Sequence, residues 1–262
     1  RMPRTLARSG VLRTVLDGTA EVIVLSELLS DPSVYPLLSG QPDLYRAFMC
    51  QVWQHQSTRG FSSLIHMETH FTDAKTPELR AAAYRYLRRH WQFINELQLF
   101  DIQHQKIYGI HVYGTEQSPS FLHATSLYHP ETVQRSLKHD GSGEEPGFKD
   151  PHTTSWDLRP HAARIEAIDE AALKTWQSVT ESTDWRSTPM VSAVNSAASR
   201  TLTTLASQSR ISTLNLQFSP GWHETSDFEK GHFEKKWGPT QWDDTILQGP
   251  HLYVSTPLYK QP

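Results

Sequence analysis

The sequence has a single cysteine, little net charge and no long apolar run. Because Cys50 is the one cysteine among 262 residues, an internal disulfide framework is excluded. Cys50 falls on the apolar side of a predicted helix, where a small buried thiol is more common than a nucleophile. The chain has no run of about 18 apolar residues and no signal-peptide pattern. These absences predict a cytoplasmic chain with no membrane partner.

Charge and composition exclude few functions. The formal net charge is −3 and the sequence pI is near 6.6, so the chain lacks the overall positive charge typical of a nucleic-acid binder. A local basic patch would still allow nucleic-acid binding. The hydrophobic share of 37% is low, but eight tryptophans add large buried areas, and together they suffice for a core. The length accommodates one large domain or two modest ones.

The most regular stretch runs from Asp43 to Gly114. Apolar spacing predicts a helix from Leu44 through at least Val52, a strand at 61–65, a helix at about 78–89, and strands at 93–100 and 107–113. Asp43 is a good N-cap for the first of these helices, and Pro77 suits the first position of the second. Alternating helices and strands of this kind indicate an α/β domain.

Short motifs within this stretch occur in a recognisable order. They are Asp43-Leu44-Tyr45-x-x-Phe48, Gly60 through His66, Tyr84-x-x-Leu87-Arg88, and Asn95-Glu96-Leu97-x-x-Phe100 before the strand at 107–113. In this order and spacing they resemble the second half of the catalytic domain of adenine-N6 DNA methyltransferases, the gamma-class type of restriction-modification and related phage-defence systems. The resemblance covers about residues 35–115 and extends more loosely to the C-terminus.

The resemblance implies a fold and a domain plan. The fold expected is the second half of a Rossmann-like S-adenosylmethionine methyltransferase domain, followed by a mixed α+β target-recognition region. The implied parts are a connecting and substrate-loop region (1–40), the catalytic half-domain (41–115), a linker with a surface loop (116–160) and a DNA-binding region (161–262). The implied reaction moves a methyl group from S-adenosylmethionine to adenine N6 in double-stranded DNA.

Two motifs of that family are missing. The sequence contains no Asn/Asp-Pro-Pro-Tyr/Phe motif and no convincing glycine-rich turn between a strand and a helix. In the gamma arrangement both precede the matching region, so no catalytic residue can be named in this chain. We therefore expect an inactive part of a longer enzyme, or a chain that works with a missing N-terminal catalytic half or with other defence-system subunits. The alternative is a non-catalytic DNA-recognition module or subunit.

Phe100 is the first candidate for contact with substrate. In the resembled family an aromatic side chain before the penultimate strand stacks on the flipped-out adenine. Chemistry on a base requires its extrusion, and an aromatic face recovers part of the lost stacking. The other interpretation is an ordinary core residue at the end of a strand. His66 and Glu68 are candidates for residues that line the pocket, since the end of this strand faces the cleft in the family. Tyr45 is a further candidate from the Leu44-Tyr45-x-x-Phe48 helix, which packs behind the catalytic loop in the family and gives Tyr45 a mainly structural role as the other interpretation.

The sequence His66-Met67-Glu68-Thr69-His70 also admits a metal interpretation. Alternate positions on a strand point to one face, so His66, Glu68 and His70 would converge as ligands in a metal-dependent hydrolase. A zinc deaminase site needs a Pro-Cys-x-x-Cys partner, which a chain with one cysteine lacks. We favour pocket residues and predict no metal, with the hydrolase left as a further hypothesis.

Basic residues gather near the end of the second predicted helix. Arg85, Arg88, Arg89 and Lys106 are the candidates for contacts with the DNA backbone, with Arg80, His90 and His104 nearby. A solvated helix end, where arginine is also favourable, explains them equally well.

The remaining segments are less regular. The apolar pattern at 21–29 predicts a strand or a short helix. Residues 139–151 are rich in glycine, proline and charge, which predicts a surface loop. The pattern further predicts a strand at 122–128, helices at 162–180 and 196–207, and a strand at 211–218. A domain boundary is expected between about 115 and 160. The C-terminal aromatic and basic residues suit either a recognition surface or an irregular core, namely Trp222, His223, Glu224, Lys235, Lys236 and Trp237.

Overall fold

The protein is a mixed α/β chain built on one five-stranded sheet. The computed structural model describes residues 9–39, 43–214, 217, 223, 225–232 and 234. The chain divides into two compact units, Arg1–Gln208 and Ser209–Pro262. The sheet and all of the residues discussed as a site lie in the first unit. None of the helices in the described ranges combines the length and the apolar character needed to cross a bilayer.

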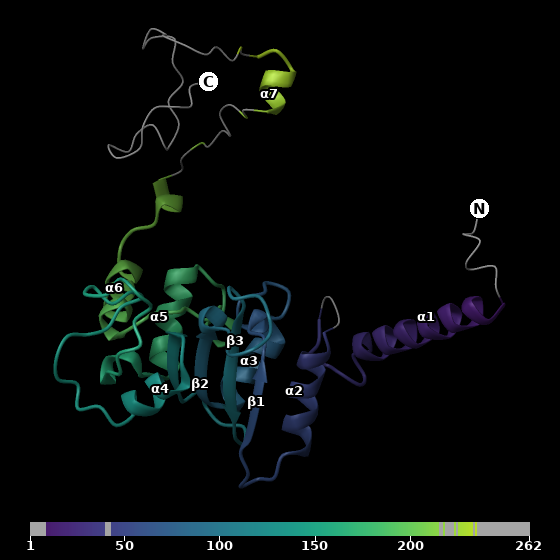
Figure 1. Cartoon of the computed structure of the whole chain (residues 1–262), viewed down its shortest axis with the longest axis horizontal. Helices are drawn as coiled ribbons and strands as arrows, with labels where there is room; N and C mark the ends of the chain where they lie inside the picture. The colour runs from purple at the N-terminus through teal and green to yellow at the C-terminus, as the bar shows by residue number, and fades with distance from the viewer. Residues whose placement is uncertain are drawn as a thin grey trace. The chain divides into compact units, whose positions relative to one another are not determined.

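The sheet has the strand order β1-β3-β2-β4-β5. β1, β3 and β2 are labelled in Figure 1. β3 is antiparallel to both β1 and β2, β4 is parallel to β2, and β5 is antiparallel to β4. The carboxyl ends of β1, β2 and β4 therefore lie at the same end of the sheet, together with the amino end of β3. We call this end the carboxyl edge. The bounds are β1 Ser62–His66, β2 Leu87–Ile94, β3 Ile107–Tyr113, β4 Phe121–Leu127 and β5 Glu166–Ile168.

Helices and short 3-10 turns connect the strands. Asp43 accepts a hydrogen bond from the Tyr45 amide and caps α2, as the sequence predicts. The helices are α1 Ser9–Ser30, α2 Leu44–His55, α3 Pro77–Tyr86, α4 Pro130–Ser136, α5 Glu170–Thr180, α6 Ser196–Ala206 and α7 Ser226–Glu229. The 3-10 turns are Thr69–Phe71, Asn95–Leu97, Ala162–Arg164, Trp185–Ser187 and Ile211–Leu214.

Each face of the sheet carries its own core. On one face α2, α3 and α5 bury Met49, Leu79 and Leu173 against strand residues that include Tyr113 and Phe121. On the other face a smaller cluster joins α4 to the sheet, with members Trp91, Phe93, Tyr108, Ala124, Leu127 and Val133. Both faces of the central strands are therefore buried, as expected for an α/β sheet.

Several predicted elements are confirmed, among them the helix at Leu44, the strand Ile107–Tyr113 and the helix at Ser196. The second helix ends at Tyr86 rather than 89, and β2 begins at Leu87, so the predicted strand at 93–100 is wrong except for its first two residues. Because Leu87, Trp91 and Phe93 are buried on different faces of β2, the strand shows no clean alternation in sequence.

The predicted helix at 162–180 is three elements. A 3-10 turn at Ala162–Arg164 and strand β5 precede α5, which begins only after Asp169 caps it by accepting a hydrogen bond from the Ala172 amide. Ile168 is apolar because it packs in the core as a strand residue, although its spacing from Leu173 and Trp176 imitates a helix. Pairing with β4 decides the local structure here.

The ends of the chain also differ from expectation. Residues 21–29 belong to one helix, α1, of 22 residues. Ile211–Leu214 form a 3-10 turn, so the described part of the predicted strand at 211–218 is not a strand. Trp222, Glu224, Lys235, Lys236 and Trp237 lie outside the described residues. The expected boundary between 115 and 160 falls inside the first compact unit, since β4 and α4 come from that segment.

Candidate functional site

A cavity opens at the edge of the sheet where β1 and β2 end and β3 begins. Its volume is about 260 Å³. The wall combines the segment that follows β1, the end of the loop before β3 and a short stretch after the turn at 185–187. Its lining residues are Met67, Glu68, Thr69, Phe71, Thr72, Gln92, Gln105, Lys106, Ile107, Met190 and Ser192. Ligands of open α/β sheets bind outside the carboxyl ends of the strands, which is this edge.

Phe100 lies in the loop between β2 and β3, which also contributes Lys106 to the cavity wall. Phe100 is 41% exposed, and its ring meets the Tyr108 ring edge-on at 4.9 Å between centroids. Phe100 is not one of the residues that line the cavity. The fully buried Asn95 fixes the loop, because its side-chain amide donates to the carbonyls of Phe100 and Ile102 at 3.0 Å and accepts from the Phe100 amide at 3.1 Å. Phe100 is thus an exposed aromatic on a held loop, and the interpretation as a core residue at the end of a strand is wrong.

Tyr45 ties α2 to the segment that follows β1. Its hydroxyl lies 2.8 Å from Thr69 Oγ1 and accepts a hydrogen bond from the His70 amide at 3.1 Å. Its ring stacks on His66 at 5.1 Å, and His66 stacks in turn on His111 at 3.9 Å with the planes nearly parallel. Tyr45 and His66 therefore lie beside the Glu68 segment without lining the cavity, while Glu68 does line it.

Three histidines form a row across the centre of the sheet. His111 of β3 is directly opposite His90 of β2, and His90 is directly opposite His123 of β4, so the three side chains share one face. All three are fully or almost fully buried. The Nδ1 atoms of His90 and His123 are 2.8 Å apart, so one proton is shared between those two rings.

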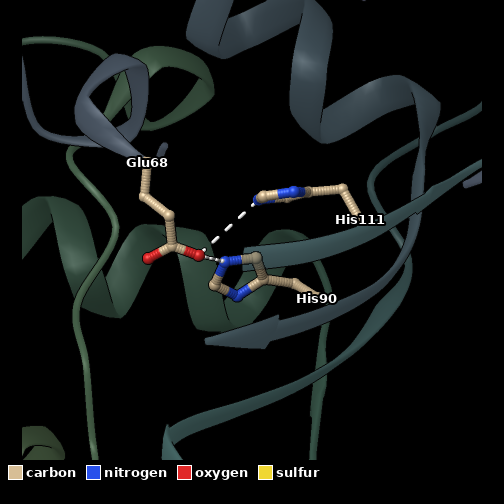
Figure 2. Close-up of side chains that lie close together, drawn as sticks. All are labelled: Glu68, His90 and His111. Carbon is tan, nitrogen blue, oxygen red and sulfur yellow. Dashed lines mark hydrogen bonds and ion pairs between the residues drawn. The ribbon is translucent and has the colours of Figure 1, made fainter. Parts of the chain in front are cut away.

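Glu68 reaches over this row from the segment after β1. Figure 2 shows its carboxylate directed at both His90 and His111. Oε1 lies 2.5 Å from His90 Nε2 and 3.6 Å from His111 Nε2, and Oε2 accepts a hydrogen bond from Gln92 Nε2 at 2.6 Å. Glu68 is itself only 8% exposed. A buried carboxylate of this kind requires such partners, because an isolated charge in the interior is very unfavourable.

The electrostatics of the group follow from burial and from this carboxylate. Burial raises the pKa of Glu68, but the charge of His90 and the proximity of His111 outweigh it and hold the pKa well below its ordinary value. Burial lowers the pKa of His111 and of His123 to about 3, and it lowers the pKa of His70 well below its usual range. At neutral pH the carboxylate is therefore charged and these three imidazoles are neutral.

Gly109 makes this close packing possible. A Cβ built at this position would lie 2.6 Å from His111 Nε2 and closer still to Glu68 Oε1. Gly109 is directly opposite both His66 and Gln92 in the sheet, so any side chain there would enter the space that the carboxylate occupies. A strand glycine often marks such a close approach.

The predicted convergence of His66, Glu68 and His70 is not observed. β1 ends at His66 and a 3-10 turn begins at Thr69, so the three side chains do not alternate along one strand. Glu68 instead converges with His90 and His111, whose possible ligand atoms all lie within 4.8 Å of one another. Sequence reasoning missed both histidines. His111 lies near the centre of the predicted strand at 107–113, but His90 falls between the predicted helix at 78–89 and the predicted strand at 93–100, so the sequence offered no signal that the two would meet.

The basic residues predicted to contact DNA have different surroundings. Arg85 is ion-paired with Glu116, and Arg88 donates to main-chain carbonyls that include those of Arg85 and Leu87. Arg89 is exposed on β2. Lys106 lies in the cavity wall.

Two neighbours of those residues are buried parts of the core rather than a basic surface. Arg80 is 3% exposed and donates to the carbonyls of His70, Asp73 and Ser187. His90 belongs to the buried row. A continuous basic helix end is therefore not present in the structure.

The sequence and the structure were compared with known proteins in three ways. No family model, no curated protein and no solved structure matches this chain.

Proposed function

We propose that this chain is the second half of the catalytic domain, with the region after it, of an S-adenosylmethionine-dependent methyltransferase that acts on adenine N6 in double-stranded DNA. The observation that carries the proposal is the cavity at the carboxyl edge of the sheet, whose wall includes Gln105 and Lys106 of the loop that also carries the exposed aromatic Phe100. Two of the sequence motifs described above, at 60–66 and 95–100, lie on β1 and in the loop before β3, which both lead to this edge.

The order of the elements supports the proposal. α2, β1, α3, β2 and β3 follow one another as the resemblance implies, and β3 returns between the two parallel strands β1 and β2. Within the described sheet the other edge of β1 has no partner strand, and Phe61 and Ile65 beside it are exposed. That edge is where the strands of a first half-domain would add.

In the proposed enzyme, different residues of the site contact different parts of the nucleotide. Phe100 stacks on the flipped adenine, and the cavity lined by Glu68, Gln92 and Lys106 receives polar groups of the nucleotide. Arg89 and Lys106 are the basic residues best placed for phosphate contacts. The cofactor and the acceptor groups that orient the adenine amine belong to the glycine-rich turn and the Pro-Pro motif, which this sequence lacks. As a consequence, the chain by itself does not methylate DNA.

The absence of those motifs also favours a second function, a DNA-recognition module that works with a separate catalytic chain. The two proposals differ in where the missing motifs are encoded. The first step is therefore to read the coding DNA in frame upstream of Arg1. A glycine-rich strand–turn–helix followed by Asn/Asp-Pro-Pro-aromatic there supports the methyltransferase half-domain, and a start codon without those motifs supports the module.

The decisive experiment measures transfer of labelled methyl groups to double-stranded DNA by this chain joined to, or mixed with, the polypeptide that carries those motifs. Stacking on a flipped base is worth about 1–3 kcal/mol, so Phe100→Ala is expected to lower kcat/KM by about 5- to 150-fold. Phe148→Ala is the matched control, because Phe148 is also an exposed phenylalanine and lies in the loop between α4 and the turn at Ala162–Arg164, away from the cavity wall and from the free edge of β1.

Two results contradict the proposal. Methyl transfer by these 262 residues alone would mean that the missing motifs are not needed. Equal activity of Phe100→Ala and Phe148→Ala would remove the assigned role of the loop.

A further inference from the structure

We propose that Glu68, His90 and His111 bind a divalent transition-metal ion of the Zn²⁺ type inside the sheet. The proposal is independent of the methyltransferase function. It rests on three buried donors that come from three separate parts of the chain, the segment after β1, β2 and β3, and meet within 4.8 Å of one another (Figure 2).

The first argument is the unpaired state of His111. Its side chain is fully buried, and neither ring nitrogen has a hydrogen-bond partner among the described residues. A buried polar group without a partner is destabilising by about 1–3 kcal/mol. Its Nε2 is aimed at the Glu68 carboxylate but stays 3.6 Å away, too far for a hydrogen bond. A metal ion between the two groups gives that nitrogen a ligand bond.

The second argument is the spacing of the donors. Tetrahedral zinc with ligand bonds of about 2.0–2.2 Å places its ligand atoms about 3.3–3.5 Å apart. The 3.6 Å between Glu68 Oε1 and His111 Nε2 is close to this value. The 2.5 Å between Glu68 Oε1 and His90 Nε2 is a hydrogen-bond distance and must open by about 1 Å when the metal replaces the proton.

The third argument is the shell of groups around the donors. Metal-binding histidines and carboxylates are usually held by a second hydrogen bond on the side away from the ion. Here His90 Nδ1 is bonded to His123 Nδ1 at 2.8 Å, and Glu68 Oε2 is bonded to Gln92 at 2.6 Å. Gly109 keeps the space between the donors free of a side chain.

The chemistry of the set selects the class of ion. Two imidazoles and one carboxylate suit zinc and its neighbours in the first transition row, whereas magnesium and calcium prefer sites made of oxygen ligands alone. The cavity of about 260 Å³ borders Glu68 and Gln92, so an ion and a water ligand can enter from that side.

The test uses the full chain without a histidine tag. After treatment with a chelator, the protein is titrated with Zn²⁺, and with Co²⁺ as a coloured probe of the ligand geometry. We expect one equivalent to bind tightly, the visible spectrum of four-coordinate Co²⁺, and a melting temperature that rises with Zn²⁺ and falls again with EDTA.

Two variants locate the ion. Glu68→Gln and His111→Gln each remove a donor and are expected to weaken binding at least a hundredfold. His66→Gln is the matched control, because His66 stacks on His111 at 3.9 Å but is not one of the three donors, and it should bind as the wild type does. Circular dichroism checks the fold of each variant.

The wild-type titration keeps the proposal falsifiable even if a donor variant fails to fold. No stoichiometric Zn²⁺ binding and no chelator-sensitive change in melting temperature would overturn the proposal. So would tight binding that survives in folded Glu68→Gln and His111→Gln proteins, because the ion would then lie elsewhere in the chain.

Discussion

Replacing Gly109 with alanine tests whether the Glu68 cluster is as tightly packed as the structure indicates. The added Cβ would lie 2.6 Å from His111 Nε2 and nearer still to Glu68 Oε1, so at least one of these buried side chains must move. The ring of His111 cannot move freely because the ring of His66 stacks on it. The Glu68 carboxylate is fixed by its hydrogen bonds with His90 and Gln92.

Three effects set the size of the change. Overpacking of a buried site costs about 1–3 kcal/mol. Loss of the charged hydrogen bond between Glu68 and His90 adds about 1.5–3 kcal/mol if the carboxylate is the group that moves. Replacing a strand glycine gains about 0.5–1 kcal/mol in backbone entropy, which is smaller than either. Gly109→Ala is therefore expected to lower the free energy of unfolding by about 2–5 kcal/mol.

The measurement is urea unfolding followed by far-UV circular dichroism, with the midpoints compared at a common slope. Gly18→Ala is the control, since Gly18 lies in α1 with no atom within 4 Å of an added Cβ, and the same substitution there should not destabilise the chain. A double variant with Glu68→Ala removes one side of the collision, so the cost of Gly109→Ala should fall in that background. A Gly109→Ala protein as stable as the wild type would refute the reasoning.

Two further predictions concern other buried groups. Asp157 is 1% exposed and faces the equally buried Arg164, so Asp157→Asn should destabilise the fold by about 3–5 kcal/mol at neutral pH. Burial raises the pKa of Asp157, but hydrogen bonds from Arg159 outweigh it and lower the pKa. The contribution of this carboxylate to the free energy of unfolding is therefore complete above its unfolded pKa of about 4, and it is lost as the pH falls through the lower folded pKa. The difference in urea midpoint between Asp157→Asn and the wild type should become smaller over that range of pH. A gap that stays constant down to acidic pH would contradict this. Burial raises the pKa of Cys50 to about 11, so alkylation at pH 8 should be at least about a hundredfold slower in the folded chain than in urea, and equal rates would show an open thiol.

The sequence alone determined the local framework of the first compact unit. Helical spacing from Leu44 with Asp43 as its cap, and the period-two pattern of residues 107–113, were strong enough to predict α2 and β3. These patterns are readable because each element has one buried side and one side that is less buried. The resemblance placed Phe100 in the loop before the strand at 107–113, where it lies, although the strand predicted at 93–100 had included it.

Only the tertiary structure decided where the less regular segments begin and end. β2 is buried on both faces, so its sequence has no period to mark it, and the pairing with β3 and β4 sets its start at Leu87. β5 is too short to be recognised without β4 beside it. Likewise the pattern of the histidine–glutamate–histidine segment suggested one strand with three ligands, whereas the chain turns after His66.

The buried cluster could not be predicted from the sequence, because its members are far apart along the chain. Glu68 comes from a turn, while His90, His111 and His123 come from three strands whose register alone places them side by side. A one-residue shift in any of those pairings would send its histidine to the opposite face. The residue types were visible in the sequence, and the strand register determined that they meet.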